Sequence, residues 1–481
     1  MANMGREPGI RCGDVERGYP EFRARAARVA GGLAALGVGP GDAVALVLRN
    51  SVEFLELSAG VAVAGANPVP VNWHWSADEL GYLLADCKAR VVFAHKEFAA
   101  TVAGVLPPGA VLVEEVDSWI DAQEPLTAAV PKSSALGVVY TSGTTGRPKG
   151  VVREPVTDEQ LVRMAMGAVE RMGLREGGST LIPAPLYHMA PNTLATIAVT
   201  VGLDVTLLER FDPEEFLAAI ERHRIEQVQV VPTMFVRLLR LPEEVRARYD
   251  LSSLRRVVHS AAPCPPKVKR AVIDWLGPIV WEYYGGSEMG AVVWCDSETW
   301  LERPGTVGLP VDGAAVRVIG SDGRDAPVGE VGSVYVRPAG YWPDFTYLDA
   351  DDKRRAMELE GFITVGDLGR LDADGYLYLA DRADDMLITG GVNVYPAEIE
   401  AALSELDGVR DSAVFGVPDE EFGQSVAAHV EVEPGSTLTE DDVRAHVRRL
   451  LAGYKVPKVV VLADKLPRDE NGKLYKRLLR A

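Results

Sequence analysis

The most informative stretch of this sequence is Tyr140-Thr141-Ser142-Gly143-Thr144-Thr145-Gly146-Arg147-Pro148-Lys149-Gly150. The apolar and partly β-branched residues 136–140 that lead into it predict a short buried strand. The stretch itself combines glycines, hydroxyl side chains and a lysine. Glycines let the backbone approach an anion closely, hydroxyl and backbone N–H groups donate to phosphate oxygens, and lysine adds positive charge. The sequence therefore predicts a phosphate-binding loop directly after a buried strand.

The spacing of this loop differs from that of a Walker A loop. In a Walker A loop the lysine follows the second glycine directly and precedes Ser or Thr. Here Arg147 and Pro148 separate Gly146 from Lys149, and Gly150 follows. A solvated Ser/Thr/Gly loop without a ligand is the alternative interpretation. The adjoining strand favours a phosphate loop of another class.

The sequence from Thr141 to Gly150 closely resembles the phosphate loop of the adenylate-forming superfamily. This superfamily includes acyl-CoA synthetases, aryl-CoA ligases, luciferases and the adenylation domains of peptide synthetases. The resemblance implies that the chain binds ATP and activates a carboxylic acid as an acyl-adenylate. It assigns nucleotide contacts to Thr141, Ser142, Gly143, Thr144, Thr145 and Lys149. It also implies that Thr145 lies beside Mg²⁺.

Length and composition limit the classes of protein to consider. The chain has 481 residues, which is too long for a single core, and its 69 acidic residues outnumber its 50 lysines and arginines, for a net charge of -19. This charge argues against a nucleic-acid or anionic-membrane partner. No apolar window reaches the roughly 18 residues of a membrane span. Four cysteines without CxxC spacing indicate neither zinc nor disulfides, so we expect a cytoplasmic protein.

The fold class predicted by the sequence is α/β. Apolar strand-like runs alternate with helical patterns, as in residues 43–48 and 53–63, and this alternation is typical of parallel sheets covered by helices. Near Asp374 the pattern changes to short alternating strands around a hairpin turn. We therefore expect an N-terminal adenylation domain of stacked, mostly parallel sheets over residues 1–383. A small, mobile α+β C-terminal domain is expected over residues 384–481.

A second motif lies in residues 281–288, Trp-Glu-Tyr-Tyr-Gly-Gly-Ser-Glu. An aromatic ring before two glycines offers a stacking surface next to backbone that a ligand can approach closely. The motif resembles the adenine and magnesium motif of the superfamily. By that resemblance Tyr284 stacks on adenine, with Gly285 beside the nucleotide. Ser287 contacts the α-phosphate, and Glu288 coordinates Mg²⁺.

A third group of residues surrounds the expected domain junction. Asp367 lies in a Gly-Asp turn, and the resemblance assigns its carboxylate to the ribose hydroxyls. It likewise assigns Arg382 to ribose or phosphate and Asp384 to the hinge between the domains. Asp381 stands where the superfamily commonly has glycine, so the turn before Arg382 is expected to differ. Gly390–Gly391 are expected to let the pantetheine arm of CoA pass.

Three further residues complete the predicted site. Lys473 follows Asn-Gly in residues 467–473, a segment that resembles the C-terminal catalytic lysine motif of the superfamily. Such a lysine stabilises the negative charge that develops as the carboxylate attacks the α-phosphate. By resemblance His188 is a gate beside the carboxylate, although a structural histidine is the alternative. Ala262 belongs to a loop that resembles the lining of the acyl and adenine sites.

These motifs predict a ligase with two half-reactions. Acid and ATP give an acyl-adenylate and pyrophosphate, and the C-terminal domain then rotates so that CoA takes the acyl group. The motifs are most similar to those of bacterial ligases for fatty, steroid-side-chain or aromatic acids. A stand-alone amide synthetase, which passes the adenylate to an amine, is a second hypothesis. A non-catalytic adenylate-binding protein is a third, more remote one. Many members of the superfamily are dimers, so a homodimer is compatible with the resemblance.

Overall fold

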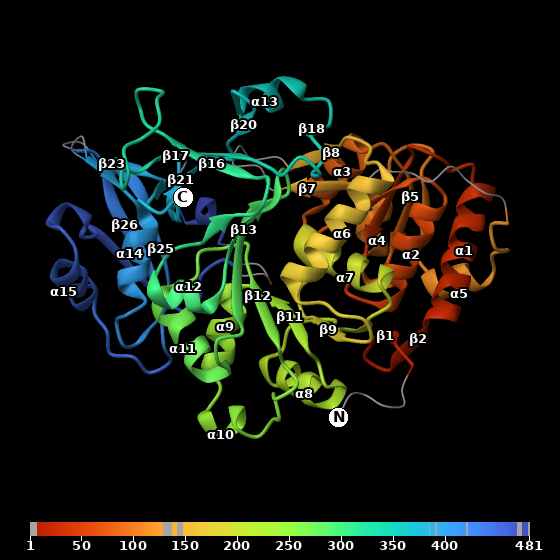
Figure 1. The fold of residues 1–481 in the computed structure, drawn as a ribbon, viewed down its shortest axis with the longest axis horizontal. Coiled ribbons are helices and arrows are strands. Elements are labelled where there is room, and N and C mark those ends of the chain that lie inside the picture. Colours follow the sequence, from red (N-terminus) through yellow and green to blue (C-terminus); the bar gives the residue numbers. More distant parts are fainter. Residues whose placement is uncertain are drawn as a thin grey trace.

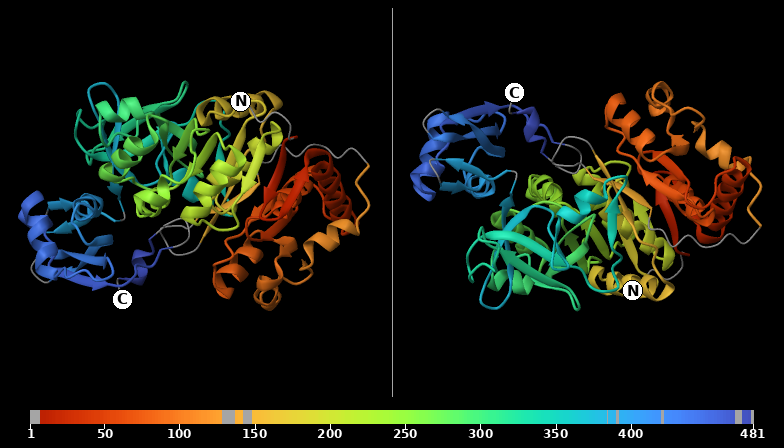
Figure 2. Two further views of the ribbon diagram at one scale, coloured as in Figure 1. Left: turned by 90° about the horizontal axis from the view of Figure 1, so that it is seen from below. Right: turned by 90° about the horizontal axis from the view of Figure 1, so that it is seen from above.

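The computed structural model consists of a large N-terminal region and a small C-terminal domain (Figure 1). The segments from residue 19 to residue 104, in red and orange, and the C-terminal domain, in blue, lie at opposite ends of the molecule; Figure 2 shows the same arrangement from two further sides. The structure describes residues 7–127, 137–141, 148–383, 385–389, 392–419, 422–468 and 474–479. These described residues form five β-sheets. None of their helices has both the length and the apolar character needed to cross a membrane.

The first sheet holds four parallel strands in the order β4-β3-β5-β6. Its strands are β3 (Ala43–Val47), β4 (Asn67–Pro70), β5 (Ala89–Ala94) and β6 (Val111–Val113), and the helices around it are α1 (Tyr19–Ala35), α2 (Val52–Val63), α3 (Ala77–Asp86), α4 (Lys96–Gly104) and α5 (Val116–Asp121). Alternate residues of β3 enter two hydrophobic cores: Val44 and Leu46 pack in one, Ala45 and Val47 in the other. This double burial explains why the strand is apolar throughout.

The second sheet has nine strands in the order β15-β14-β13-β12-β11-β9-β10-β1-β2, and its central strands are parallel. The strands are β1 (Gly9–Cys12), β2 (Val15–Gly18), β9 (Ser179–Ile182), β10 (Asp204–Leu207), β11 (Gln227–Val230), β12 (Arg256–His259), β13 (Val280–Gly286), β14 (Gly290–Cys295) and β15 (Leu309–Pro310). The helices are α6 (Asp158–Met172), α7 (Met189–Thr200), α8 (Pro213–His223), α9 (Pro232–Leu239), α10 (Glu243–Arg246), α11 (Pro266–Leu276) and α12 (Ser297–Glu302). Val228 and Val230 of β11 pack in the core formed with α8, α9 and α11, whereas Gln227 and Gln229 point to the opposite face.

Two antiparallel sheets follow. The smaller is β7 (Val138–Thr141), β8 (Lys149–Arg153) and β18 (Phe345–Tyr347). The larger is β16 (Ala315–Ile319), β17 (Gly332–Arg337), β19 (Glu358–Leu359), β20 (Phe362–Ile363), β21 (Asp367–Leu371) and β22 (Leu377–Arg382), with α13 (Asp351–Ala356) between β18 and β19. The larger antiparallel sheet therefore begins at β16, well before Asp374, where the sequence predicted the change to short alternating strands. The two sheets share a hydrophobic core with β13 and β14, which brings the phosphate hairpin beside the second motif.

The C-terminal domain is a mixed sheet covered by two helices. Its elements are β23 (Leu387–Thr389), β24 (Val392–Val394), α14 (Pro396–Leu403), β25 (Val409–Asp419), β26 (Gly423–Val432), α15 (Glu440–Leu450), β27 (Val459–Ala463) and two 3₁₀ turns, Gly453–Lys455 and Lys476–Leu478. β22 still belongs to the N-terminal sheets and β23 to this one. The α/β fold class with a small second domain is thus confirmed, and the boundary between residues 383 and 384 stays a prediction.

Candidate active site

The hairpin of β7 and β8 carries the predicted phosphate loop at its tip, since Thr141 pairs with Lys149 across its base. The side chain of Thr141 and the whole of Ser142, Gly143, Thr144 and Thr145 lie outside the described residues. Lys149 Nζ lies 5.2 Å from the ring centroid of Tyr347 in β18. Tyr140 Oη donates a hydrogen bond to Asp86 Oδ2 of α3 at 2.6 Å. The hairpin is thereby held at its base by elements on two sides.

Tyr347 connects the phosphate hairpin to the second motif. Its hydroxyl donates to Glu288 Oε1 at 2.9 Å, while its ring lies beside Lys149. Burial and the neighbouring Glu288 carboxylate raise the pKa of Tyr347, so the hydroxyl remains a donor at neutral pH. Sequence reasoning missed this residue because its position depends on the pairing of Tyr347 with Val151, which no local motif reveals.

Glu288 is suited to hold Mg²⁺. Its carboxylate is oriented by Tyr347 and stands in the turn between β13 and β14. Mg²⁺ usually binds one or two protein carboxylates together with substrate phosphates. Among the residues that the structure describes, no group of three or more His, Cys, Asp or Glu could enclose a metal ion. The donor set therefore fits a cation that Glu288 would share with the phosphates of a nucleotide.

The glycines of the second motif allow two strands to approach unusually closely. A Cβ added to Gly285 would stand 1.9 Å from the carbonyl oxygen of Gly290, so no side chain fits there. Gly290 itself has φ +68, a left-handed conformation that favours glycine. The ladder shifts its register between Tyr284 and Gly285. These features bring the two strands close together at the base of the turn that carries Ser287 and Glu288.

Three residues that the sequence assigned to the nucleoside lie together. Tyr284 Oη donates to Asp367 Oδ2 at 2.7 Å, and Arg382 Nε lies 3.0 Å from Asp367 Oδ1. Asp367 and Arg382 are direct partners in the β21–β22 hairpin. Tyr284 and Asp367 are buried, and burial beside the Asp367 carboxylate raises the pKa of Tyr284. The individual roles of these residues toward adenine and ribose stay predictions.

A buried arginine that the sequence analysis did not single out lies next to Ser287. One terminal nitrogen of Arg153, Nη2, donates to the carbonyl oxygen of Ser287 and lies 3.3 Å from Met189 Sδ. His188 immediately precedes Met189 and occupies the N-cap position of α7, with its ring 4.4 Å from that of Tyr187. The predicted carboxylate gate and the predicted α-phosphate contact are thus linked through Arg153.

The loop that contains Ala262 follows β12 and lies at the end of β13. Ala261 adopts φ +74, a strained conformation for a residue with a Cβ, and Ala262 is half-buried. Beneath this loop Lys269 Nζ lies 2.6 Å from Glu282 Oε2, and both side chains are almost fully buried. Burial raises the pKa of Glu282, and Lys269 opposes that shift. This ion pair ties α11 to β13 directly behind the second motif.

Asp381 has a structural reason for replacing the expected glycine. Its Oδ2 accepts the backbone N–H of Ala397 at 2.8 Å, and its Oδ1 accepts that of Arg382 at 2.7 Å. The N-cap residue of α14, Tyr395, makes no side-chain capping bond, so Asp381 supplies that acceptor from the other domain. Burial raises the pKa of Asp381. Of the C-terminal predictions, Asp384, Gly390, Gly391 and Lys473 lie outside the described residues.

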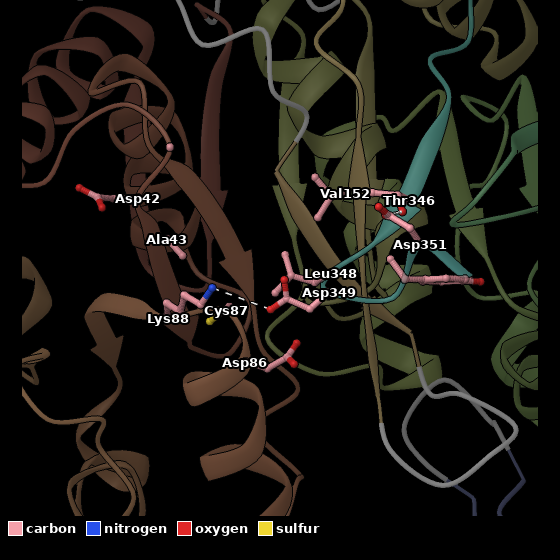
Figure 3. Close-up of a pocket in the computed structure, with 12 residues that line it drawn as sticks. Asp42, Ala43, Asp86, Cys87, Lys88, Val152, Thr346, Leu348, Asp349 and Asp351 are labelled. Atoms are coloured by element: carbon pink, nitrogen blue, oxygen red, sulfur yellow. Dashed lines mark hydrogen bonds and ion pairs between the residues drawn. The ribbon is translucent and has the colours of Figure 1, made fainter. Parts of the chain in front are cut away.

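A cavity of about 450 Å³ opens between the first sheet and β18. Figure 3 shows Lys88 of this cavity pointing toward Asp349, at 3.8 Å. Both side chains are exposed, and both residues have positive φ. The cavity reaches the site at Tyr347 and at Asp86, which bonds to Tyr140, and none of its lining residues was predicted to bind nucleotide or acid. We therefore place the candidate site at the β13–β14 turn and not in this cavity.

Family models match most of the chain. Residues 5–342 match the AMP-binding enzyme family, and residues 398–473 match the AMP-binding enzyme C-terminal domain. A feruloyl-CoA synthase of Amycolatopsis sp is 36% identical over 478 residues, which cover 97% of this chain and 94% of that protein. A long-chain fatty acid–CoA ligase, FadD13 of Mycobacterium tuberculosis, is 33% identical over 488 residues, with coverages of 97% and 93%.

Solved structures match the chain as well. ATP-bound MatB from Rhodopseudomonas palustris superposes with a TM-score of 0.86 at 28% identity, covering 100% of this chain and 96% of that chain. The amide bond synthetase McbA from Marinactinospora thermotolerans superposes with a TM-score of 0.86 at 27% identity, with coverages of 98% and 96%. With the site geometry and the family matches, these findings show that the chain belongs to the AMP-binding enzyme family, as a member of its AMP-forming acid–CoA ligases.

Proposed function

We propose that the protein joins a carboxylic acid to CoA in two steps. In the first, a carboxylate oxygen of the acid attacks the α-phosphorus of ATP, so that an acyl-adenylate forms and pyrophosphate leaves. In the second, the CoA thiol loses its proton and attacks the acyl carbon, so that a thioester forms and AMP leaves. The proposal rests on two networks that meet at the β13–β14 turn: Tyr284 with Asp367, and Glu288 with Tyr347.

The first network holds the nucleoside. The ring of Tyr284 stacks on adenine, with Gly285 and the half-buried Ala262 beside the base. Asp367 accepts hydrogen bonds from the ribose hydroxyls, which its carboxylate can do while it keeps Tyr284 and Arg382, because each oxygen has two acceptor sites. Preorganised contacts of this kind fix the α-phosphate in position for attack.

The second network holds the phosphates. Ser287 donates to the α-phosphate, while Lys149 and the loop of residues 141–145 hold the phosphates that leave. Glu288, together with Thr145, binds Mg²⁺, which neutralises part of the phosphate charge when bound. Lys473 stabilises the charge that develops during attack, and His188 lies beside the reacting carboxylate.

The second step follows a rotation of the C-terminal domain about Asp384. The rotation withdraws Lys473 and brings Gly390–Gly391 to the channel through which the CoA thiol arrives. In the present orientation Arg240 of the N-terminal region donates to the carbonyl oxygen of Arg410 and lies 3.6 Å from Glu433. Such partly exposed contacts contribute about 0–1 kcal/mol each, which a rotating domain can release.

The acid is a fatty, steroid-side-chain or aromatic acid. Relatives named as a feruloyl-CoA synthase and a long-chain fatty acid–CoA ligase support acids of this apolar kind. The protein acts in the cytoplasm, where ATP and CoA are available, and as a homodimer. Size-exclusion chromatography with light scattering tests the dimer, and a monomer at micromolar concentration would contradict it.

Transfer to an amine is the second candidate. The observation that favours it is the fit to an amide bond synthetase, which is as good as the fit to an o-succinylbenzoate CoA synthetase of Bacillus subtilis. A non-catalytic adenylate-binding protein is disfavoured, because Lys473, Glu288 and Asp367 are all present in the sequence.

Mass spectrometry of products separates these candidates. The enzyme is incubated with ATP, Mg²⁺ and a pool of carboxylic acids, and the mixture is divided between CoA and a set of amines. We expect an acyl-CoA in the first tube, and its mass identifies the acid. An amide in the second tube without a thioester in the first would assign the protein to the synthetases.

A variant tests the assignment of the two half-reactions. Lys473→Ala is expected to abolish adenylate formation and to spare thioester formation from a supplied acyl-adenylate. Lys465→Ala, an exposed lysine of the same domain, is the matched control and should leave both reactions intact. Equal loss of both half-reactions in Lys473→Ala would contradict the domain rotation.

A further inference from the structure

Arg153 is a buried cation that forms no ion pair with any residue that the structure describes. Only 6% of the residue's surface is exposed. Its protein contacts are a backbone carbonyl and a thioether sulfur, and its Nε has no hydrogen-bond partner among the described residues. Glu288 is the one acidic group whose charge bears on it, and the two form no ion pair within the described part of the chain. A buried charge left in this state is costly, so the site is complete only with an additional acceptor.

A second unpartnered donor lies beside the first. The guanidinium carbon of Arg153 is 5.6 Å from the ring centroid of Trp342, and Trp342 Nε1 is buried without a partner among the described residues. The ring is held against the active-site turn, because a Cβ added to Gly290 would come within 2.7 Å of it. Both unpartnered atoms are buried N–H donors on side chains that face each other, and one side chain is charged, so an oxyanion fits as the missing partner.

Arg153 lies at the opposite end of β8 from Lys149. Lys149 and Arg153 stand four residues apart on β8, which places their Cα atoms about 13 Å apart along the strand. Lys149 lies next to Tyr347, whereas Arg153 reaches the carbonyl oxygen of Ser287 and Met189, which follows His188. With His188 as the proposed gate beside the carboxylate, Arg153 lies between the α-phosphate contact and the acid substrate. Burial lowers its pKa to about 10, and Glu288 opposes that shift, so the guanidinium stays charged at neutral pH.

We propose that Arg153 and Trp342 form an oxyanion subsite beside the acid substrate, and that the preferred substrate, within the acid classes proposed above, is one that carries a second carboxylate. The inference deepens the proposed function and rests on it. The reacting carboxylate loses its charge when the adenylate forms, so a strong cation on it would stabilise the ground state and slow the reaction. A second carboxylate keeps its charge through both steps, and a fixed arginine can hold it throughout.

Binding is measured first, because it does not depend on turnover. Calorimetry compares succinate, glutarate, adipate and terephthalate with butyrate, valerate, hexanoate and benzoate, each in the presence of a non-hydrolysable ATP analogue. The wild-type enzyme should bind one of the dicarboxylates at least about tenfold more tightly than the matched monocarboxylate. Arg153→Met should lose about a hundredfold in affinity for it, the usual effect of removing one partner of a buried charge pair. Trp342→Phe keeps an aromatic ring but removes the indole N–H, and it should lose about tenfold in affinity for the dicarboxylate.

Turnover then tests specificity. Arg153→Met should reverse the kcat/KM preference toward the monocarboxylate, because an apolar wall replaces the cation, while the KM for ATP stays unchanged. Arg153→Lys keeps the charge and should retain part of the dicarboxylate preference. If Arg153→Met does not fold, Arg153→Lys is the variant on which the preference is measured. Arg337→Met, an exposed arginine over Phe362, is the matched control.

Three results would overturn the inference. If Arg153→Met loses affinity and kcat/KM equally for the dicarboxylate and the monocarboxylate, Arg153 only supports the turn that carries Ser287. A raised KM for ATP without a change in acid preference would assign the oxyanion to the nucleotide. Equal binding of dicarboxylates and monocarboxylates by the wild-type enzyme would exclude the subsite even if acyl-CoA forms. If no acid yields acyl-CoA but the dicarboxylates bind through Arg153, the proposed function fails and the subsite stands.

Discussion

Substituting Tyr347 by phenylalanine removes one hydroxyl and leaves the rest of the site in place. The hydroxyl donates to Glu288 Oε1 at 2.9 Å, and the ring that remains still packs beside Lys149. A hydrogen bond to a charged group contributes about 1.5–3 kcal/mol. If that energy holds Glu288 in its metal-binding orientation, kcat/KM for MgATP should fall roughly ten- to a hundredfold. The concentration of Mg²⁺ required for half-maximal rate should rise in parallel.

The assay is pyrophosphate release at saturating acid, with MgATP and free Mg²⁺ varied independently. Tyr335→Phe, in β17, is the matched control and should be indistinguishable from wild type. The pH profile should not move, because the pKa of Tyr347 is raised and the hydroxyl is neutral throughout the working range. A tenfold loss that added Mg²⁺ does not relieve, or no loss at all, would refute the role given to this hydrogen bond.

Three further substitutions test the surroundings of the site. Gly285→Ala should lower the free energy of unfolding in urea by about 1–3 kcal/mol and should slow adenylate formation, because a Cβ there meets the Gly290 backbone. Gly104→Ala is the control: its Cβ enters open space, so neither the unfolding free energy nor the rate should fall. Lys269→Met should cost about 3–5 kcal/mol in urea unfolding. Burial raises the pKa of Glu282, so in Lys269→Met this carboxylate takes up a proton as pH falls and no longer carries an unpaired charge. The loss of unfolding free energy in this variant should therefore shrink as pH falls. Burial also raises the pKa of Asp381, so the folded state holds that proton more tightly and stability falls as pH rises through the raised pKa. Asp381→Asn should flatten this dependence in unfolding measured from acidic to neutral pH, and an unchanged slope would contradict it.

Much of the fold follows from local patterns in the sequence. The predicted strand 43–48 and helix 53–63 correspond to β3 and α2, because burial on both faces and helical periodicity leave a signal in consecutive residues. The hairpin predicted near Asp374 pairs Asp367 with Arg382, so two separately predicted residues lie together. The antiparallel sheet that begins at β16 was not anticipated, since its short strands carry a weak alternation.

The residues that were missed depend on contacts between distant parts of the chain. Arg153 and Ser287 are 134 positions apart, and Tyr347 reaches Glu288 only because β18 pairs with β8. Neither contact is encoded in a local motif. Asp381 was noticed only as a departure from glycine, and its reason required the position of the Ala397 N–H in the other domain.

The central claim is that ATP is cleaved between its α- and β-phosphates to make an acyl-adenylate. The most direct test is mass spectrometry of a quenched reaction that contains enzyme, ATP, Mg²⁺ and the acid identified from the pool, before and after CoA is added. We expect enzyme-bound acyl-AMP with equimolar pyrophosphate, followed by acyl-CoA and AMP on addition of CoA. ADP and orthophosphate as the nucleotide products, with no acyl-AMP, would contradict it.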